Sequence, residues 1–163
     1  MSSAMDVLWT ELTAGIPDGR HLIIFLVRLL AATIFGAAIG YERQRAGKAA
    51  GLRTHILVSA GTAMFILGCE SAGIRTDSDA ISRVIQGIIT GIGFVGAGSI
   101  IKRDSERDIQ GVTTSAGIWM TAAIGVTVGL GGLGLAIIAT ILALLVLRVS
   151  ARVEERLLSS KQT

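Results

Sequence analysis

Five long apolar runs alternate with short polar segments along this chain. They cover residues 22–40, 52–73, 81–101, 111–129 and 133–149. At about 1.5 Å per helical residue, a run of roughly 20 residues crosses a hydrocarbon layer about 30 Å thick. The pattern predicts an all-α polytopic membrane protein. Its 163 residues form one integral domain, a bundle of five transmembrane helices.

The two ends of the chain are more polar than the runs. Near the start, Met5, Leu8, Trp9 and Leu12 follow helical spacing, which favours a short helix lying at the membrane interface. A frayed terminus is the alternative, and the sequence leaves both open. The tail, residues 150–163, places its arginines close to one face, so we expect an amphipathic segment along the anionic cytoplasmic surface.

Composition supports the membrane class and excludes others. The chain is 51% hydrophobic, contains one proline and has a mean hydropathy of +0.66. Its single cysteine, Cys69, excludes an internal disulfide or a cysteine-based metal cluster. The sequence pI near 9.6 is also a feature of nucleic-acid-binding proteins. Here the basic residues cluster at the ends of the runs, so we predict no nucleic-acid partner.

The distribution of lysine and arginine predicts the topology. Counted over five spans, eleven basic residues fall on one side, and only Arg20 and Arg75 on the other. The eleven are Arg43, Arg45, Lys48, Arg53, Lys102, Arg103, Arg107, Arg148, Arg152, Arg156 and Lys161. Loops rich in these residues stay in the cytoplasm. We therefore expect the N-terminus outside and the C-terminus in the cytoplasm.

The third run is dense in glycine. On a helical wheel Gly87, Gly91 and Gly98 lie within about 40° of each other, and Gly93 and Gly96 lie nearly opposite. Small residues on two faces let neighbouring helices approach closely on both sides. The spacing predicts that this glycine-rich third helix is the centre of the bundle.

Charged residues inside the runs are a second unusual feature. In the predicted topology Arg28, Glu70 and Arg83 all fall in the outer half of the membrane. Charges at such depth are costly and are usually paired. We expect Glu70 to bridge one or both arginines, either as a structural ion pair or as part of a transport site. His55, Ser59, Thr62, Cys69 and Glu70 also share one polar face of the second run.

Several short motifs resemble the MgtC/SapB family of bacterial inner-membrane proteins. They are Glu42-Arg43-Gln44, the segments 50–55 (AGLRTH) and 93–98 (GFVGAG), and the segments 111–119 (GVTTSAGIW) and 122–125 (AAIG). The resemblance implies five spans and a link to growth under magnesium limitation, with a virulence association in pathogens. Some members carry a soluble C-terminal domain, and the short tail here implies a form lacking it.

The motifs flank the third run at the predicted cytoplasmic interface and form a candidate cluster. Its members are Glu42, Arg43, Arg53, Thr54, His55, Asp108, Thr113 and Thr114. Threonines there are suited to cap helices, and Arg53 with His55 at a helix start would suit an anion. A magnesium site needs clustered carboxylates, and only Glu42 and Asp108 are available. The metal therefore stays unknown, and no cofactor is predicted.

These observations favour a non-enzymatic membrane protein that regulates other membrane proteins or ion homeostasis. The alternative is a small ion transporter or channel that uses the polar face of the second run. An enzyme is disfavoured because no nucleophile with a base is present, and His21 and His55 fall on opposite sides. The expected partners are the lipid bilayer and other membrane proteins, with a homo-oligomer left open.

Overall fold

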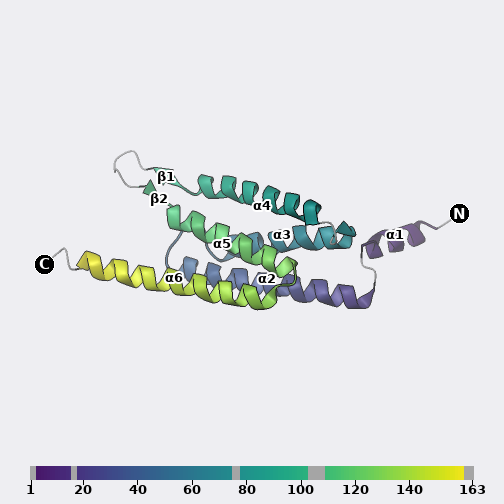
Figure 1. The fold of residues 1–163 in the computed structure, drawn as a ribbon, viewed down its shortest axis with the longest axis horizontal. Coiled ribbons are helices and arrows are strands. Elements are labelled where there is room, and N and C mark those ends of the chain that lie inside the picture. Colours follow the sequence, from purple (N-terminus) through teal and green to yellow (C-terminus); the bar gives the residue numbers. More distant parts are fainter. Residues whose placement is uncertain (1–2, 16–17, 75–77, 103–108, 160–163) are drawn as a thin grey trace.

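The computed structural model describes residues 3–15, 18–74, 78–102 and 109–159. Figure 1 shows the arrangement. The helices are α1 (Ala4–Thr13), α2 (Gly19–Arg45), α3 (Leu52–Ser71), α4 (Ser78–Gly98), α5 (Val112–Gly129) and α6 (Leu133–Ser159). Two short strands, β1 (Ile101–Lys102) and β2 (Ile109–Gln110), pair antiparallel between α4 and α5. The all-α class is confirmed.

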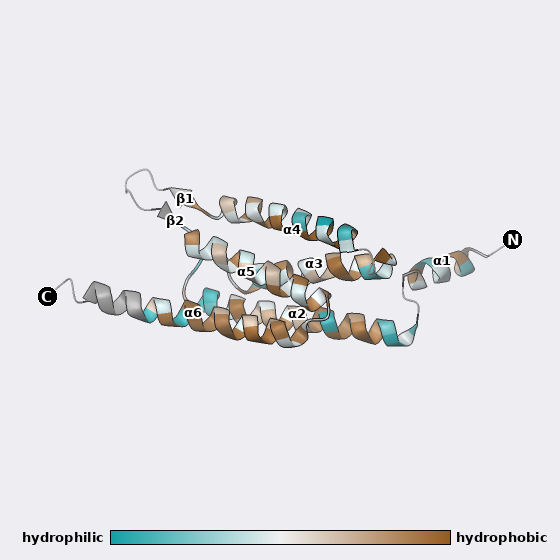
Figure 2. Ribbon diagram, viewed as in Figure 1, coloured by the Kyte–Doolittle hydropathy of each residue, from teal (hydrophilic) through white to brown (hydrophobic). Residues whose placement is uncertain are grey.

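Five of these helices, α2 to α6, are long and apolar enough to cross a membrane, as predicted. Apolar residues run along these helices (Figure 2), and many large apolar side chains are exposed. Phe94 is 83% exposed and Ile138 is 64% exposed, for example. The buried positions, in contrast, include histidine, serine and threonine. Such an arrangement suits a lipid solvent, in which apolar side chains on the outside cost nothing.

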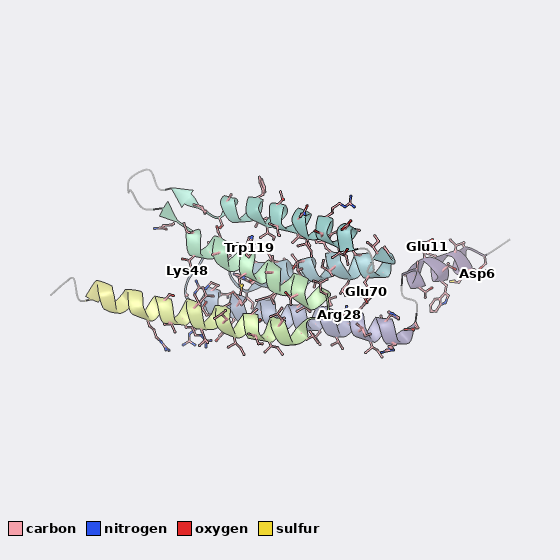
Figure 3. All side chains as sticks on the ribbon, in the orientation of Figure 1. Asp6, Glu11, Arg28, Lys48, Glu70 and Trp119 are labelled. Atoms are coloured by element: carbon pink, nitrogen blue, oxygen red, sulfur yellow. The ribbon has the colours of Figure 1, made fainter. Side chains whose placement is uncertain are left out.

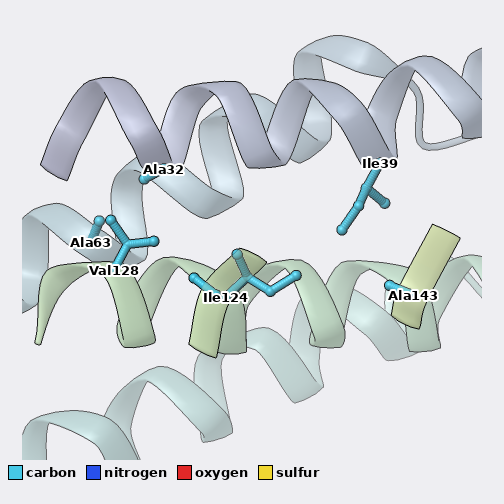
Figure 4. Close-up of a cluster of buried hydrophobic side chains, with 7 residues drawn as sticks. Ala32, Ile39, Ala63, Ile124, Val128 and Ala143 are labelled. Carbon is cyan, nitrogen blue, oxygen red and sulfur yellow. The ribbon is translucent and has the colours of Figure 1, made fainter. Parts of the chain in front are cut away.

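Helix α5 is the centre of the bundle. It contacts α2, α3, α4 and α6, and half of its residues are buried. Ile124 and Val128 of α5 pack against Ala32 and Ile39 of α2 and against Ala63 of α3 (Figure 4). The two alanines let the backbones of the three helices come close together.

The prediction that the third span is central was wrong. Gly96 is the only buried residue of α4, and this helix lies at one edge of the bundle (Figure 1). A side chain added at Gly96 would touch Ser115 of α5, whereas one added at Gly87, Gly91, Gly93 or Gly98 would meet no other atom within 4 Å. Glycine spacing shows that a helix can be approached closely, but it does not determine whether a neighbour is present.

The closest approaches use glycines of α2 and α5 instead. A Cβ atom at Gly36 would lie 2.5 Å from the His55 carbonyl oxygen, and one at Gly40 would lie 2.8 Å from the Leu52 Cα. A Cβ atom at Gly125 would overlap the Ser59 carbonyl. These contacts bring both α2 and α5 close to α3, and the two helices also pack against each other.

Most helix boundaries lie within three residues of the expected ones; α4, for example, covers 78–98 where 81–101 was expected. Two boundaries differ by more. The first span continues through Arg45, so Glu42, Arg43 and Gln44 lie on the last turn of α2 rather than in a loop. The helix ends where Gly47 adopts a φ of +66°, a conformation that glycine adopts without strain.

The tail is the second difference. Helix α6 runs unbroken from Leu133 to Ser159. The residues after Val149 therefore continue the helix axis (Figure 1) and do not form a separate segment turned onto the membrane surface. No proline or glycine follows Gly134 in the sequence, so nothing in the local chemistry ends the helix at the predicted boundary.

Candidate functional site at the ends of α2, α3 and α5

Glu42 and Arg43 form an ion pair on the last turn of α2. The Arg43 guanidinium donates twice to the Glu42 carboxylate, with Nη2 at 2.8 Å from Oε1 and Nε at 2.5 Å from Oε2. Arg43 is only 2% exposed, and the Glu42 side chain is 10% exposed. Burial of either charge alone would be costly, and the two-point contact satisfies both groups. The pair is thus a neutral unit.

The third residue of the motif, Gln44, closes the turn to the next helix. Its Oε1 accepts a hydrogen bond of 3.2 Å from the backbone N–H of Leu52, the first residue of α3. The N-cap residue, Gly51, has no side chain to supply this bond. Gln44 therefore satisfies one of the open N–H groups at the start of α3. A glutamine eight residues upstream of the helix was not predicted as its cap.

His55 lies at the centre of the site and is fully buried. Its Nδ1 is 2.7 Å from Thr121 Oγ1 of α5, and that hydroxyl donates to the Gly117 carbonyl at 2.8 Å. A threonine hydroxyl has one proton to give, so Nδ1 must carry the proton of the neutral imidazole. Nε2 is then left as an acceptor.

Two buried polar atoms of α3 make no hydrogen bond among the described residues. They are His55 Nε2 and Ser59 Oγ, one turn apart. Buried polar atoms without a hydrogen-bond partner are rare, which sets this part of α3 apart from the rest of its polar face.

Further along α3 the polar face is closed by direct packing. Thr62 Oγ1 lies 2.9 Å from the Val58 carbonyl of its own helix and 3.1 Å from the Ala122 carbonyl of α5. The backbones of α3 and α5 touch at Gly125. The hydroxyl groups thus serve as a packing seam between α3 and α5.

The structure unites only part of the predicted cytoplasmic cluster. Glu42, Arg43 and His55 come together, and Thr114 is buried on the α5 face that carries Gly117 and Thr121. Arg53 and Thr113 are exposed, Thr54 is half-buried, and Asp108 lies outside the described residues. Arg53 and His55 point to different environments, so the expected anion site between them is not formed.

A second charged cluster lies at the opposite end of the bundle. Arg28 Nη1 is 2.7 Å from Glu70 Oε2 and 3.0 Å from the Gly129 carbonyl, which joins α2, α3 and α5 (Figure 3). Pairing of Glu70 with one or both of Arg28 and Arg83 was predicted, and the pairing with Arg28 is confirmed. Arg83 is exposed on α4, where its Nε lies 3.4 Å from the Asp79 carbonyl, so it is not part of this pair.

No group of three or more histidine, cysteine, aspartate or glutamate side chains is placed to hold a metal ion in the described part of the chain. The buried site therefore offers a neutral ion pair, one imidazole acceptor and hydroxyl groups. This chemistry suits packing, proton binding or hydration.

Five apolar helices that enclose buried polar side chains define a multi-pass membrane protein. The chain belongs to the MgtC family, whose profile matches residues 29–156. No solved structure gives a significant match to it.

Three curated relatives show how far the similarity extends. YhiD of Escherichia coli K12 is 41% identical over 83% of this chain and 64% of its own length. SrpB of Synechococcus elongatus is 40% identical over 81% of this chain and 77% of its own length. MgtC of Salmonella typhimurium is 42% identical over 74% of this chain and 49% of its own length. The chain thus spans about half to three quarters of these relatives.

Proposed function

We propose that this protein is a non-enzymatic membrane regulator that acts on other membrane proteins or on ion homeostasis under magnesium limitation. Membership of the MgtC family supports the link to magnesium, as does the relative named "Putative magnesium transporter YhiD". We place it in the bacterial inner membrane with the C-terminus in the cytoplasm, on the basis of the basic residues that gather at one end.

The observation that carries the proposal is the closed polar face of α3. His55, Ser59 and Thr62 are at most 4% exposed, and α5 packs directly on them. Beyond them, Ile66 and Leu67 are each 3% exposed, so apolar packing separates this face from Glu70. An ion path needs a hydrated lining that replaces the ion's water shell. A sealed seam favours a protein that acts through its surfaces.

A transporter is the second candidate, and one observation favours it. His55 Nε2 and Ser59 Oγ are buried without a hydrogen-bond partner in the described structure. Such atoms would gain a partner from a water molecule or an ion if α5 moved away from α3. In this alternative, the closed seam is one state of an alternating cycle.

Flux and growth measured on the same protein separate the two candidates. Purified protein would be reconstituted into liposomes that contain a magnesium-sensitive dye, with protein-free liposomes as the control. In parallel, a strain that lacks the native gene would be complemented and grown at low magnesium. We expect restored growth with no magnesium flux above the control.

The variant Ser59→Ala makes the comparison sharper because it removes a buried hydroxyl without adding bulk. Magnesium flux that exceeds the control and falls in Ser59→Ala would overturn the regulator proposal. Failure of the wild-type chain to restore growth would overturn the link to magnesium limitation.

A further inference from the structure

The edge position of α4 leaves an apolar groove between this helix and α3. Its volume is about 470 Å³. From α3 it is lined by Thr62 and Phe65, and from α4 by Val84, Gly87, Ile88, Gly91, Ile92 and Val95. Gly87 and Gly91, which contact no other helix, thus form part of the wall of this groove.

The length and the lining of the groove indicate what suits it. The lining residues of α4, from Val84 to Val95, extend over about 16 Å at 1.5 Å per residue. Apart from Thr62, every lining residue is apolar or glycine. Such a surface suits an extended hydrocarbon chain.

Polar residues lie at one end of the groove. Ser82, Arg83 and Gln86 are exposed on the first turns of α4, at the end of the bundle where Arg28 and Glu70 also lie. Arg83 is one helical turn from Gly87 and therefore shares its side of the helix. Its guanidinium makes one hydrogen bond within the described chain, to the Asp79 carbonyl. Asp79, one turn before Arg83, is also exposed at this end. The remaining donors of Arg83 make no other hydrogen bond among the described residues and are available to an anion at the membrane surface.

We propose that this groove binds one anionic phospholipid, with the phosphate at Arg83 and an acyl chain along Gly87 and Gly91. The match is that of an amphiphile, a polar end with an exposed arginine followed by an apolar groove. Guanidinium donors suit phosphate oxygens. An anionic headgroup is preferred over a zwitterionic one because it brings no cation of its own close to Arg83.

Quenching of a single tryptophan by brominated lipid tests the site. The reporter is Phe65→Trp, a wall position 63% exposed, in a chain that also carries Trp9→Phe and Trp119→Phe. The control is Ile138→Trp in the same background, 64% exposed on α6 and at a similar distance from the same end of the bundle. Each protein is placed in phosphatidylcholine vesicles with a small fraction of brominated phosphatidylglycerol or brominated phosphatidylcholine.

At the Phe65→Trp position we expect half-maximal quenching at about fivefold lower brominated phosphatidylglycerol than brominated phosphatidylcholine, the effect of one arginine near an anionic headgroup. The Ile138→Trp position should show no preference. Adding Arg83→Gln should make the two lipids equal at the Phe65→Trp position.

Equal quenching by both lipids at the Phe65→Trp position would overturn the proposal. The same preference at the Ile138→Trp position, or a preference that survives Arg83→Gln, would overturn it as well. Protection of the Phe65→Trp position from both lipids would also overturn it, because a second copy or another protein would then cover the groove.

Discussion

The guanidinium of Arg28 lies 2.7 Å from the Glu70 carboxylate and 3.0 Å from the Gly129 carbonyl, so one side chain ties together three helices. Both side chains are about one-tenth exposed. The carbonyl belongs to the last residue of α5, where the partial negative charge of the helix end favours a cation. A single arginine thus sets the register of α2 against both α3 and α5.

Removing one partner of the Arg28–Glu70 pair should destabilise the bundle more than removing both partners together. Glu70→Gln leaves the Arg28 charge without its carboxylate, which costs about 3–5 kcal/mol for a buried pair. The double change Glu70→Gln with Arg28→Leu should cost less, because no uncompensated charge remains. Thermal unfolding in detergent measures both variants. Arg83→Leu is the matched control and should stay close to the wild type, since Arg83 is exposed. Equal losses for the single and double variants would contradict the pairing.

Glycines should differ sharply in their tolerance of a methyl group. Gly125→Ala places a Cβ against the Ser59 carbonyl and must push α5 away from α3, whereas Gly91→Ala meets no other atom within 4 Å. Overpacking of this kind costs about 1–3 kcal/mol. We expect a lower unfolding temperature for Gly125→Ala and almost no change for Gly91→Ala. A larger loss for Gly91→Ala than for Gly125→Ala would indicate that α4, and not α5, is the central helix.

The His55–Thr121 hydrogen bond should be important for the α3–α5 contact. Thr121→Val keeps the shape of the side chain but leaves Nδ1 of a fully buried imidazole without an acceptor. An unsatisfied buried donor costs about 1–3 kcal/mol. Adding His55→Phe to Thr121→Val should recover part of the loss. A double-mutant cycle on thermal unfolding gives the coupling directly, and zero coupling would show that the bond does not contribute.

The topology prediction is tested by reporter fusions. Fusions after Ala72, Arg107 and Lys161 should report outside, cytoplasm and cytoplasm, because the loops rich in lysine and arginine are retained. A cytoplasmic signal after Ala72 would overturn the orientation. The order of the five helices would remain unaffected.

The stability of the first turn of α2 should depend on pH, because the N-cap of the helix is the carboxylate of Asp18. The backbone N–H of His21 donates to Asp18 Oδ1 at 2.8 Å, and this bond and the His21 side chain hold the pKa of Asp18 below its usual 3.8. A lowered carboxyl pKa means that the cap contributes fully above pH 4 and is lost as pH falls through the folded-state pKa. Hydrogen exchange of the first turn should be faster in Asp18→Ala at pH 6. The difference should disappear under strongly acidic conditions, and a difference that persists there would exclude the carboxylate as its cause.

The sequence was sufficient for the number of spans and for one long-range contact. Span number follows from the length of each apolar run, which is a local property and needs no knowledge of neighbours. Pairing of Glu70 with an arginine was predictable because a charge inside a membrane has few ways to be satisfied, but the choice of Arg28 over Arg83 came from the structure. The cost of an unpaired charge applies to any arrangement of the helices in which the two residues lie at the same depth.

Only the tertiary structure decided which helix is central and which residues form the buried site. Lipid tails and the protein interior are both apolar, so hydropathy does not distinguish a face toward lipid from a face toward protein. The glycines of α4 therefore looked like packing positions, although most of them touch no other helix. In the same way, Thr121 became the partner of His55 only because α3 and α5 lie side by side, a contact between residues 66 positions apart.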